Sequence, residues 1–267
     1  MLGHIDFGYS LAGAFVSFLV GLTGVGGGSL MSPILILFFG VSPALAVGTD
    51  LWFAAVTKTI GGFTHHRMRS VDWPVVRRLA LGSLPAALLT LLWLWLFEGG
   101  EIDDKPLKTL LGCALLLTSV LMIFKPRIQP LMVAFRNRFV GSAKMRTRQR
   151  IIIMAGGAIV GVMVTLTSIG AGALVAVLLA TAYPLRMGTK RIVGTDIVHA
   201  VPLTIVAGAG HAALGNVDVW LLASLLIGSI PGIVVGSLVA GKIPENWVRY
   251  ALAAMLVVSA LKMLGFF

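Results

Sequence analysis

The sequence predicts an all-α membrane protein built from two inverted-topology repeats. Three observations lead to this fold class: the composition, an internal repeat and the distribution of charge. Of the 267 residues, 58% are hydrophobic and only 12% are charged, and the mean hydropathy is +0.98. Soluble domains carry about 25% charged residues. A chain of this composition is expected to reside in the cell membrane, which would be the inner membrane in a Gram-negative bacterium.

The internal repeat is centred on the tetrapeptide Val47-Gly48-Thr49-Asp50, which recurs 146 residues later as Val193-Gly194-Thr195-Asp196. At that fixed offset, 13 of the 39 residues from 47 to 85 are identical to their counterparts. Self-similarity at a constant spacing indicates two copies of one structural unit. We therefore expect a first transmembrane repeat over residues 1–124 and a second over residues 151–267, joined by a basic connector at 125–150.

Apolar segments predict about eight full transmembrane helices, since a helix needs ~20 residues to cross a bilayer. They lie at residues 9–24, 43–64, 75–97, 107–124, 151–167, 192–213, 218–240 and 247–267. Two shorter apolar segments, 29–40 and 173–183, each follow a glycine-rich break. These two are expected either to cross the membrane at an angle or to dip in and return.

The charge distribution predicts the orientation of the two repeats. The connector at 125–150 contains eight Lys or Arg residues and no acid, which marks it as cytoplasmic. The loops that this choice places inside hold 17 of the 21 basic residues. Equivalent loops of the two halves have opposite charge, so one repeat is expected to be inverted. Inverted repeats are typical of secondary transporters, whose sites lie near the repeat interface. The same placement of charge argues against a nucleic-acid partner.

Asp50 and Asp196 are the only acids within apolar spans, at matched repeat positions. A carboxylate in hydrocarbon costs ~2.5–3.5 kcal/mol, so both should face the bundle interior or a wet cavity. They are candidates for proton coupling or substrate binding. The alternative is a structural aspartate that bonds backbone groups at a neighbouring helix break, and the two roles are compatible.

Glycine-rich breaks supply the candidate substrate site. A broken helix exposes backbone N–H groups that can line an anion-binding concavity. The candidate residues from the breaks and from the repeated motif are Thr23, Gly24, Gly26, Gly27, Gly28, Ser29, Gly48, Thr49, Ser168, Gly170, Gly172, Gly194 and Thr195. The alternative is close helix packing through small residues, which is common in membranes.

Lys58 and His199 are candidates for an anion path. Lys58 follows Asp50 by two helical turns, and its amine could instead reach the cytoplasmic surface. His199 has no equivalent in the first repeat, where Phe53 stands, and a packing role is the alternative. The single cysteine, Cys113, can form neither an internal disulfide nor a cysteine cluster for a metal. No metal and no cofactor is expected.

These motifs resemble the TauE/SafE sulfite-exporter family over nearly the whole chain. The residues that carry the resemblance are Gly24-Val25-Gly26-Gly27-Gly28, Ala46-Val47-Gly48-Thr49, His65 with Val71-Asp72-Trp73, and Leu81-Gly82-Ser83-Leu84-Pro85. The resemblance implies a polytopic transporter of small sulfur oxyanions or organosulfonates, usually in the direction of export. In that family the residue after the Gly-Thr pair is more often serine, whereas this chain has Asp50 and Asp196. Two carboxylates disfavour a dianion such as sulfite unless one is protonated.

The sequence therefore predicts a secondary transporter, and not an enzyme, that moves a small anion with possible coupling to protons. The expected partners are a small-molecule anion and the lipid bilayer, and a homo-oligomer is allowed. The alternative is an intramembrane enzyme that acts on a lipid-linked phosphate. Such an enzyme would need acids together with Arg or Ser in a pocket at membrane depth, but the Arg residues of this chain crowd the loops.

Overall fold

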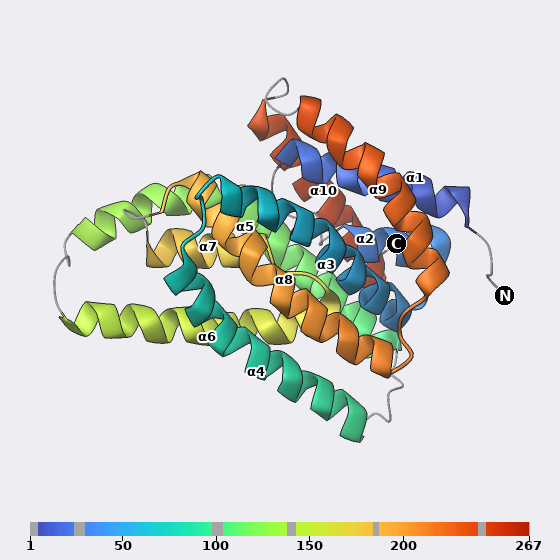
Figure 1. Ribbon diagram of the computed structural model, residues 1–267, viewed down its shortest axis with the longest axis horizontal. Coiled ribbons are helices and arrows are strands. Elements are labelled where there is room, and N and C mark those ends of the chain that lie inside the picture. Colours follow the sequence, from blue (N-terminus) through green and yellow to red (C-terminus); the bar gives the residue numbers. More distant parts are fainter. Residues whose placement is uncertain are drawn as a thin grey trace.

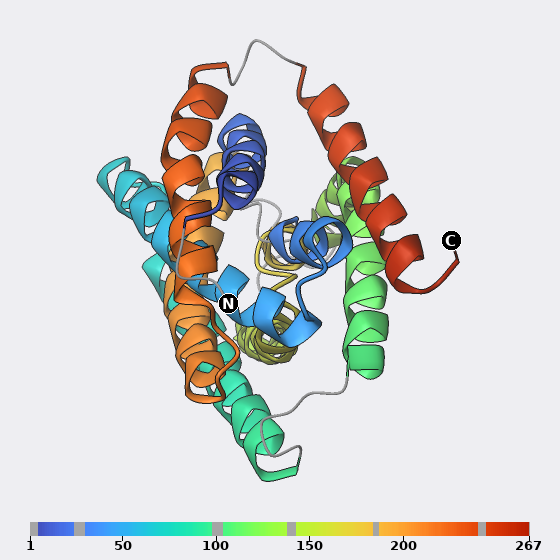
Figure 2. The ribbon, with the colours of Figure 1, turned by 90° about the vertical axis from the view of Figure 1, so that its right-hand side faces the viewer.

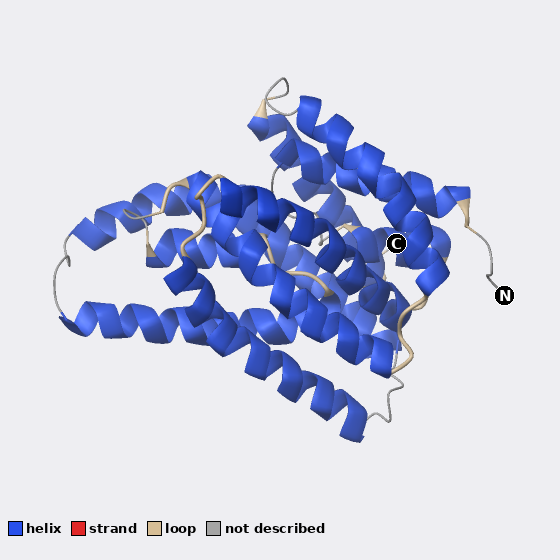
Figure 3. Ribbon diagram, viewed as in Figure 1, coloured by secondary structure: helices blue, strands red, loops and turns tan. Residues whose placement is uncertain are grey.

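The computed structural model describes residues 5–23, 30–97, 104–137, 143–183, 187–239 and 244–266. Within these ranges the chain is helical and contains no strand (Figure 3). The helices are α1 (Phe7–Thr23), α2 (Met31–Phe39), α3 (Pro43–Arg67), α4 (Trp73–Phe97), α5 (Asp104–Asn137), α6 (Ala143–Thr167), α7 (Ala173–Ala182), α8 (Thr189–Ala213), α9 (Val219–Val239) and α10 (Glu245–Met263).

Among the described residues, five helical stretches are long and apolar enough to cross a membrane. These are Trp73–Phe97, Asp104–Phe124, Thr147–Thr167, Lys190–Ala213 and Val219–Gly236. The 25-residue helix α3 is not among them, because Asp50, Lys58 and the basic last turn lower its apolarity. The all-helical, multi-pass fold is thus confirmed, while the number of eight full spans stays a prediction.

Both short segments form short helices. Helix α2 has nine residues and α7 has ten, so each is ~14–15 Å long, about half the thickness of the hydrocarbon core. The turn before α7 contains Gly170 and Gly172 at φ 118° and 127°, conformations that glycine adopts at little cost. These dihedrals end α6 and let the chain start a new helix inside the bundle.

The two halves of the sequence pack into one another, because the most extensive helix pairs join a helix of one half to a helix of the other. Helix α1 packs along α9, and α4 packs along α6 (Figures 1 and 2). Glycines allow this close approach: a Cβ on Gly232 would overlap the backbone of Ala14, and a Cβ on Gly161 would overlap the backbone of Ser83. Small residues let helix backbones approach closely in membranes, where apolar burial alone gives little drive to associate.

Helices α3 and α8 pack side by side and run antiparallel (Figure 1). Near one end of the contact, the indole N–H of Trp52 donates a hydrogen bond to the carbonyl of Gly208 at 2.9 Å. Toward the other end, a Cβ on Gly62 would meet Val198 Cγ2 at 3.5 Å. These two contacts define the register of the antiparallel pair, because the residues from 52 to 62 on α3 correspond to the residues from 208 back to 198 on α8.

The basic connector predicted at residues 125–150 overlaps the ends of two helices. Helix α5 continues to Asn137 and α6 begins at Ala143, so most of residues 125–150 are helical. The two helices extend beyond the rest of the bundle (Figure 1). The high content of Lys and Arg indicates the side of the membrane, but it does not stop a helix, because both residues have high helix propensity.

Candidate functional site

Asp50 lies where three parts of the chain meet. Its carboxylate is fully buried, and the hydroxyl of Ser32, at the start of α2, donates a hydrogen bond to Oδ2 at 2.7 Å. Ser168, in the turn between α6 and α7, lies close enough to stabilise this carboxylate, but its Oγ makes no hydrogen bond of normal geometry with another described residue. The other carboxylate oxygen, Oδ1, has no hydrogen-bond partner among the described residues.

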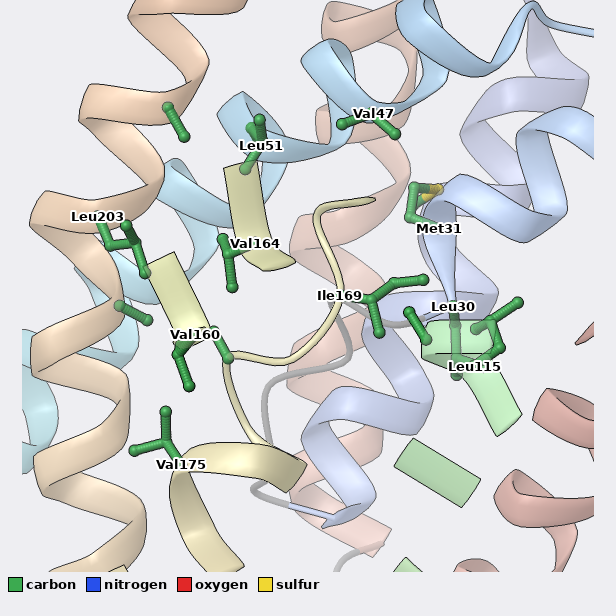
Figure 4. Close-up of a cluster of buried hydrophobic side chains, with 14 of the residues drawn as sticks. Leu30, Met31, Val47, Leu51, Leu115, Val160, Val164, Ile169, Val175 and Leu203 are labelled. Carbon is green, nitrogen blue, oxygen red and sulfur yellow. The ribbon is translucent and has the colours of Figure 1, made fainter. Parts of the chain in front are cut away.

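The turn that contains Ser168 is part of the buried core. In the view of Figure 4, Ile169 marks this turn between α6 at Val164 and the start of α2 at Met31. Ser168 itself has a positive φ of 56°, which is uncommon for a residue other than glycine. Strained backbone of this kind is concentrated at functional sites. The second glycine-rich break therefore reaches Asp50.

Lys58 is a buried cation between the two aspartates. Its side chain is only 7% exposed, and it interacts electrostatically with both Asp50 and Asp196. Asp50 and Lys58 are eight residues apart on α3, so they are about 80° apart around the helix and ~12 Å apart along its axis. The burial of this lysine favours the anion path over the alternative that its amine reaches the cytoplasmic surface.

His199 connects α8 to α4 beside the same charges. Its Nε2 shares a 2.8 Å hydrogen bond with Ser83 Oγ, and both side chains are fully buried. Its other ring nitrogen, Nδ1, has no hydrogen-bond partner among the described residues. Lys58 also interacts electrostatically with His199.

We call this group of buried polar side chains the polar cluster. It consists of Asp50, Lys58, Asp196 and His199 together with Ser32, Ser83 and Ser168. Two carboxylates and one ammonium leave the cluster with one excess negative charge when all three are ionised and His199 is neutral. Unbalanced charge at membrane depth is expensive, so such a cluster can bind a proton or exchange one counter-ion for another.

The repeated Gly-Thr pairs make a different set of contacts, and these are reciprocal. Thr49 Oγ1 accepts a hydrogen bond from the backbone N–H of Asp218 at 3.2 Å, and Thr195 Oγ1 accepts one from the N–H of Asp72 at 3.0 Å. Asp72 and Asp218 are themselves separated by 146 residues. Each threonine thus holds the start of a helix in the opposite half of the chain.

The glycines next to these threonines follow the same pattern. A Cβ on Gly48 would overlap the carbonyl oxygen of Asn216, and a Cβ on Gly194 would lie 2.6 Å from the carbonyl oxygen of Ser70. Gly48, Thr49, Gly194 and Thr195 therefore contact the helix connections of the other half. The structure does not bring their side chains into the polar cluster, although Asp50 and Asp196 follow directly in sequence.

The first glycine-rich break cannot be placed in the same way. Gly24, Gly26, Gly27, Gly28 and Ser29 lie outside the described residues, and Thr23 ends α1. Ser32, three residues after this break in the sequence, donates a hydrogen bond to Asp50.

Three contacts at the site were missed by sequence reasoning. Ser32 is a single serine in an apolar helix, and although Ser83 belongs to the repeat, matching Ser229, the repeat does not indicate that it bonds to His199. Arg191 Nε lies 3.8 Å from Asp72 Oδ2, where the first repeat has the apolar Leu45 in place of the arginine. This asymmetry between matched positions was the one signal that could have revealed that pair.

The helical fold, the apolar spans and the buried charges define a multi-pass membrane protein of the transporter class. The family model of the sulfite exporter TauE/SafE matches residues 9–263, and the chain belongs to this family. It is 38% identical over 259 residues to the probable membrane transporter protein YjnA of Bacillus subtilis (strain 168), which covers 95% of this chain and 98% of that relative.

More distant relatives have similar names. The probable membrane transporter protein YdhB of the same bacterium is 25% identical over 88% of this chain and 90% of its own length. A probable membrane transporter protein of Methanocaldococcus jannaschii is 26% identical over 95% of this chain and 93% of its own length. No solved structure matches the chain. Membership of the family therefore rests on the whole length of the chain.

Proposed function

We propose that the protein is a secondary transporter of a small anion, coupled to protons through Asp50 and Asp196. The observation that carries the proposal is the position of these two acids. They occupy the same place in the repeated motif, both are buried, and one lies on each of α3 and α8, which pack side by side. Buried ionisable residues at membrane depth mark ion pathways and proton relays.

The helix directions support two inverted repeats as the framework. A Cβ on Gly13 would lie 3.0 Å from Cα of Leu225, and Ser17 Oγ bonds to Ser229 Oγ at 2.6 Å, so α1 and α9 run parallel. The topology predicted from the basic residues requires α1 and α9 to be parallel and α3 and α8 to be antiparallel. We therefore assign residues 1–124 and 151–267 to the two repeats, with 125–150 between them on the cytoplasmic side.

In this framework the reciprocal Gly-Thr contacts act as two equivalent closures. Thr49 with Asp218 lies toward one face of the membrane, and Thr195 with Asp72 lies toward the other. Alternating access requires one repeat to move against the other around a fixed central site. Opening one closure at a time would expose either Asp50 or Asp196 to water, and the exposed acid could then take up or release a proton.

The family assigns the substrate only by its name, the sulfite exporter family. We propose a small anion such as sulfite, another sulfur oxyanion or an organosulfonate, moved in the direction of export. The two glycine-rich breaks are the candidate binding elements, because unpaired backbone N–H groups bind oxyanions. The proposal assigns transport and not catalysis to the polar cluster.

The test is uptake of labelled sulfite, sulfate and methanesulfonate into proteoliposomes, with and without an imposed pH gradient. The proposal predicts uptake of at least one of these anions above that of empty liposomes, and faster uptake when the gradient drives protons in the same direction. The absence of uptake for all three, in protein shown to be folded and inserted, would contradict an anion transporter of this class. Uptake that ignores the gradient would contradict proton coupling.

A further inference from the structure

The register of α3 against α8 places Lys58 between the two acids of the proposed transport site. Trp52 lies opposite Gly208, and Gly62 lies opposite Val198. In this register the numbers of two facing residues, one on α3 and one on α8, add up to 260. Asp196 then lies at the level of residue 64 of α3. Lys58 is eight residues from Asp50 and six residues from this level, or ~12 Å and ~9 Å along the helix axis.

The repeat symmetry places the same lysine at a special point. The numbers of equivalent residues in the two repeats differ by 146, and the numbers of residues that face each other on α3 and α8 add up to 260. Residues 57 and 203 satisfy both relations, so they are repeat equivalents that also face each other. Lys58 is thus next to the centre of the pseudo-symmetric pair. Its own equivalent is Thr204, which is uncharged and fully enclosed. One buried lysine therefore lies between two equivalent carboxylates.

We propose that Lys58 is a shared counter-cation that pairs in turn with one aspartate, with the transported anion and with the other aspartate. It follows that the substrate is a monovalent anion that crosses together with one proton. This inference rests on the proposed transport function, and it adds the charge of the substrate and the stoichiometry of coupling. A lysine suits this role, because its ammonium is a point charge on a flexible four-carbon stem.

Charge balance gives the stoichiometry. In the empty state, the Lys58 ammonium is balanced by one carboxylate, while the other acid is protonated, and the buried charge is zero. When a monoanion binds to the ammonium, the displaced carboxylate takes up one proton, and the total charge is again zero. A dianion would leave one uncompensated negative charge, because no second carboxylate remains to accept a proton. Uncompensated charge at this depth is disfavoured by several kcal/mol.

The other groups that face the cluster do not alter this balance. From α4 comes Ser83, from α2 Ser32, and from the turn before α7 Ser168, all neutral hydroxyls. His199 on α8 is a further titratable side chain that interacts with Lys58. Its protonation would bring a second positive charge next to the ammonium in a buried site.

The transport test compares methanesulfonate, a monoanion, with sulfate, a dianion near neutral pH, in proteoliposomes. We expect wild-type protein to take up methanesulfonate with one proton each, at a rate that a potassium diffusion potential does not change. Lys58→Met should reduce this uptake by more than tenfold, Lys58→Arg should retain most of it, and Lys190→Met, on an exposed lysine of α8, should not affect it. Uptake that depends on the potential, preference for sulfate, or normal uptake by Lys58→Met would overturn the inference.

A second measurement decides the role of Lys58 without transport. Lys58→Met leaves two buried carboxylates without their cation, so its melting temperature in detergent should fall below those of wild type and Lys190→Met. Adding Asp50→Asn or Asp196→Asn removes one carboxylate and should restore part of the loss. If the wild-type protein transports neither methanesulfonate nor sulfate, the result counts against the proposed function. If Lys58→Met and Lys190→Met have the same melting temperature, the result counts against the shared cation itself.

Discussion

The contact between Gly48 and the opposite half of the chain predicts a measurable cost for the smallest possible side chain. A Cβ at Gly48 would overlap the carbonyl oxygen of Asn216 and would lie 3.1 Å from His211 Cβ. Asn216 lies in the connection between α8 and α9, and His211 lies in the last turn of α8, so the backbone itself would have to move. Gly61, on the same helix, is the matched control, because its Cβ would meet only Ile197 Cγ2 at an ordinary 3.6 Å.

The expected magnitudes follow from two opposing effects. Replacing glycine by alanine within a helix is favourable by ~1 kcal/mol at either position. Overpacking against fixed neighbours costs ~1–3 kcal/mol, and this applies to Gly48 alone. Gly61→Ala should therefore stabilise the protein by ~1 kcal/mol, while Gly48→Ala should range from neutral to destabilising by ~2 kcal/mol.

Unfolding in a mixed-detergent titration measures this difference directly. Gly194→Ala provides a second test, since its Cβ would lie 2.6 Å from the carbonyl oxygen of Ser70 in the equivalent contact. The reasoning is refuted if Gly48→Ala and Gly61→Ala have the same free energy of unfolding, because the close approach of the two halves would then contribute nothing to stability.

Two further predictions concern topology and the second break. In a Cys113→Ala background, Ser142→Cys should not react with an impermeant thiol reagent in intact cells, while Gly100→Cys should react. The reason is that the basic residues place 125–150 inside. The reverse labelling pattern would invalidate the assigned orientation. Gly172→Leu should abolish transport and leave membrane insertion intact. The φ angle of 127° at this position strains the backbone of any residue with a side chain. Transport at the wild-type rate by this variant would show that the second break is not part of the site.

The sequence was sufficient to predict the all-helical membrane fold, the short helices and the family, while the inverted repeats and the number of eight spans stay predictions. Composition and the constant offset of 146 residues are properties of the whole chain, so they can be recognised without knowing any individual contact. The helical course of α5 to Asn137 was not foreseen, because basic residues report the side of the membrane and not the backbone conformation. Helix propensity and tertiary contacts decide where such a helix ends.

The candidate site was predicted less completely. Asp50 and Asp196 were found because an acid in an apolar segment stands out, and Lys58 was noted for the same reason. The roles of the repeated glycines and threonines were not evident, since a small residue can face a ligand or another backbone, and only the structure shows Gly48 against Asn216. Ser32 could not be assigned to Asp50, because a single hydroxyl in an apolar helix usually bonds to its own backbone.

The central claim is that the two matched acids couple anion transport to protons, and one pair of variants tests it most directly. Asp50→Asn and Asp196→Asn keep the volume and the hydrogen-bonding reach of the side chains but remove the titratable group. Each variant, reconstituted in proteoliposomes, is assayed for net uptake driven by a pH gradient and for exchange of labelled anion at equal pH. We predict that both variants insert, that each loses the pH-driven uptake, and that exchange is retained in at least one of them. Full pH-driven uptake by both variants would contradict the mechanism and leave the two aspartates with a structural role.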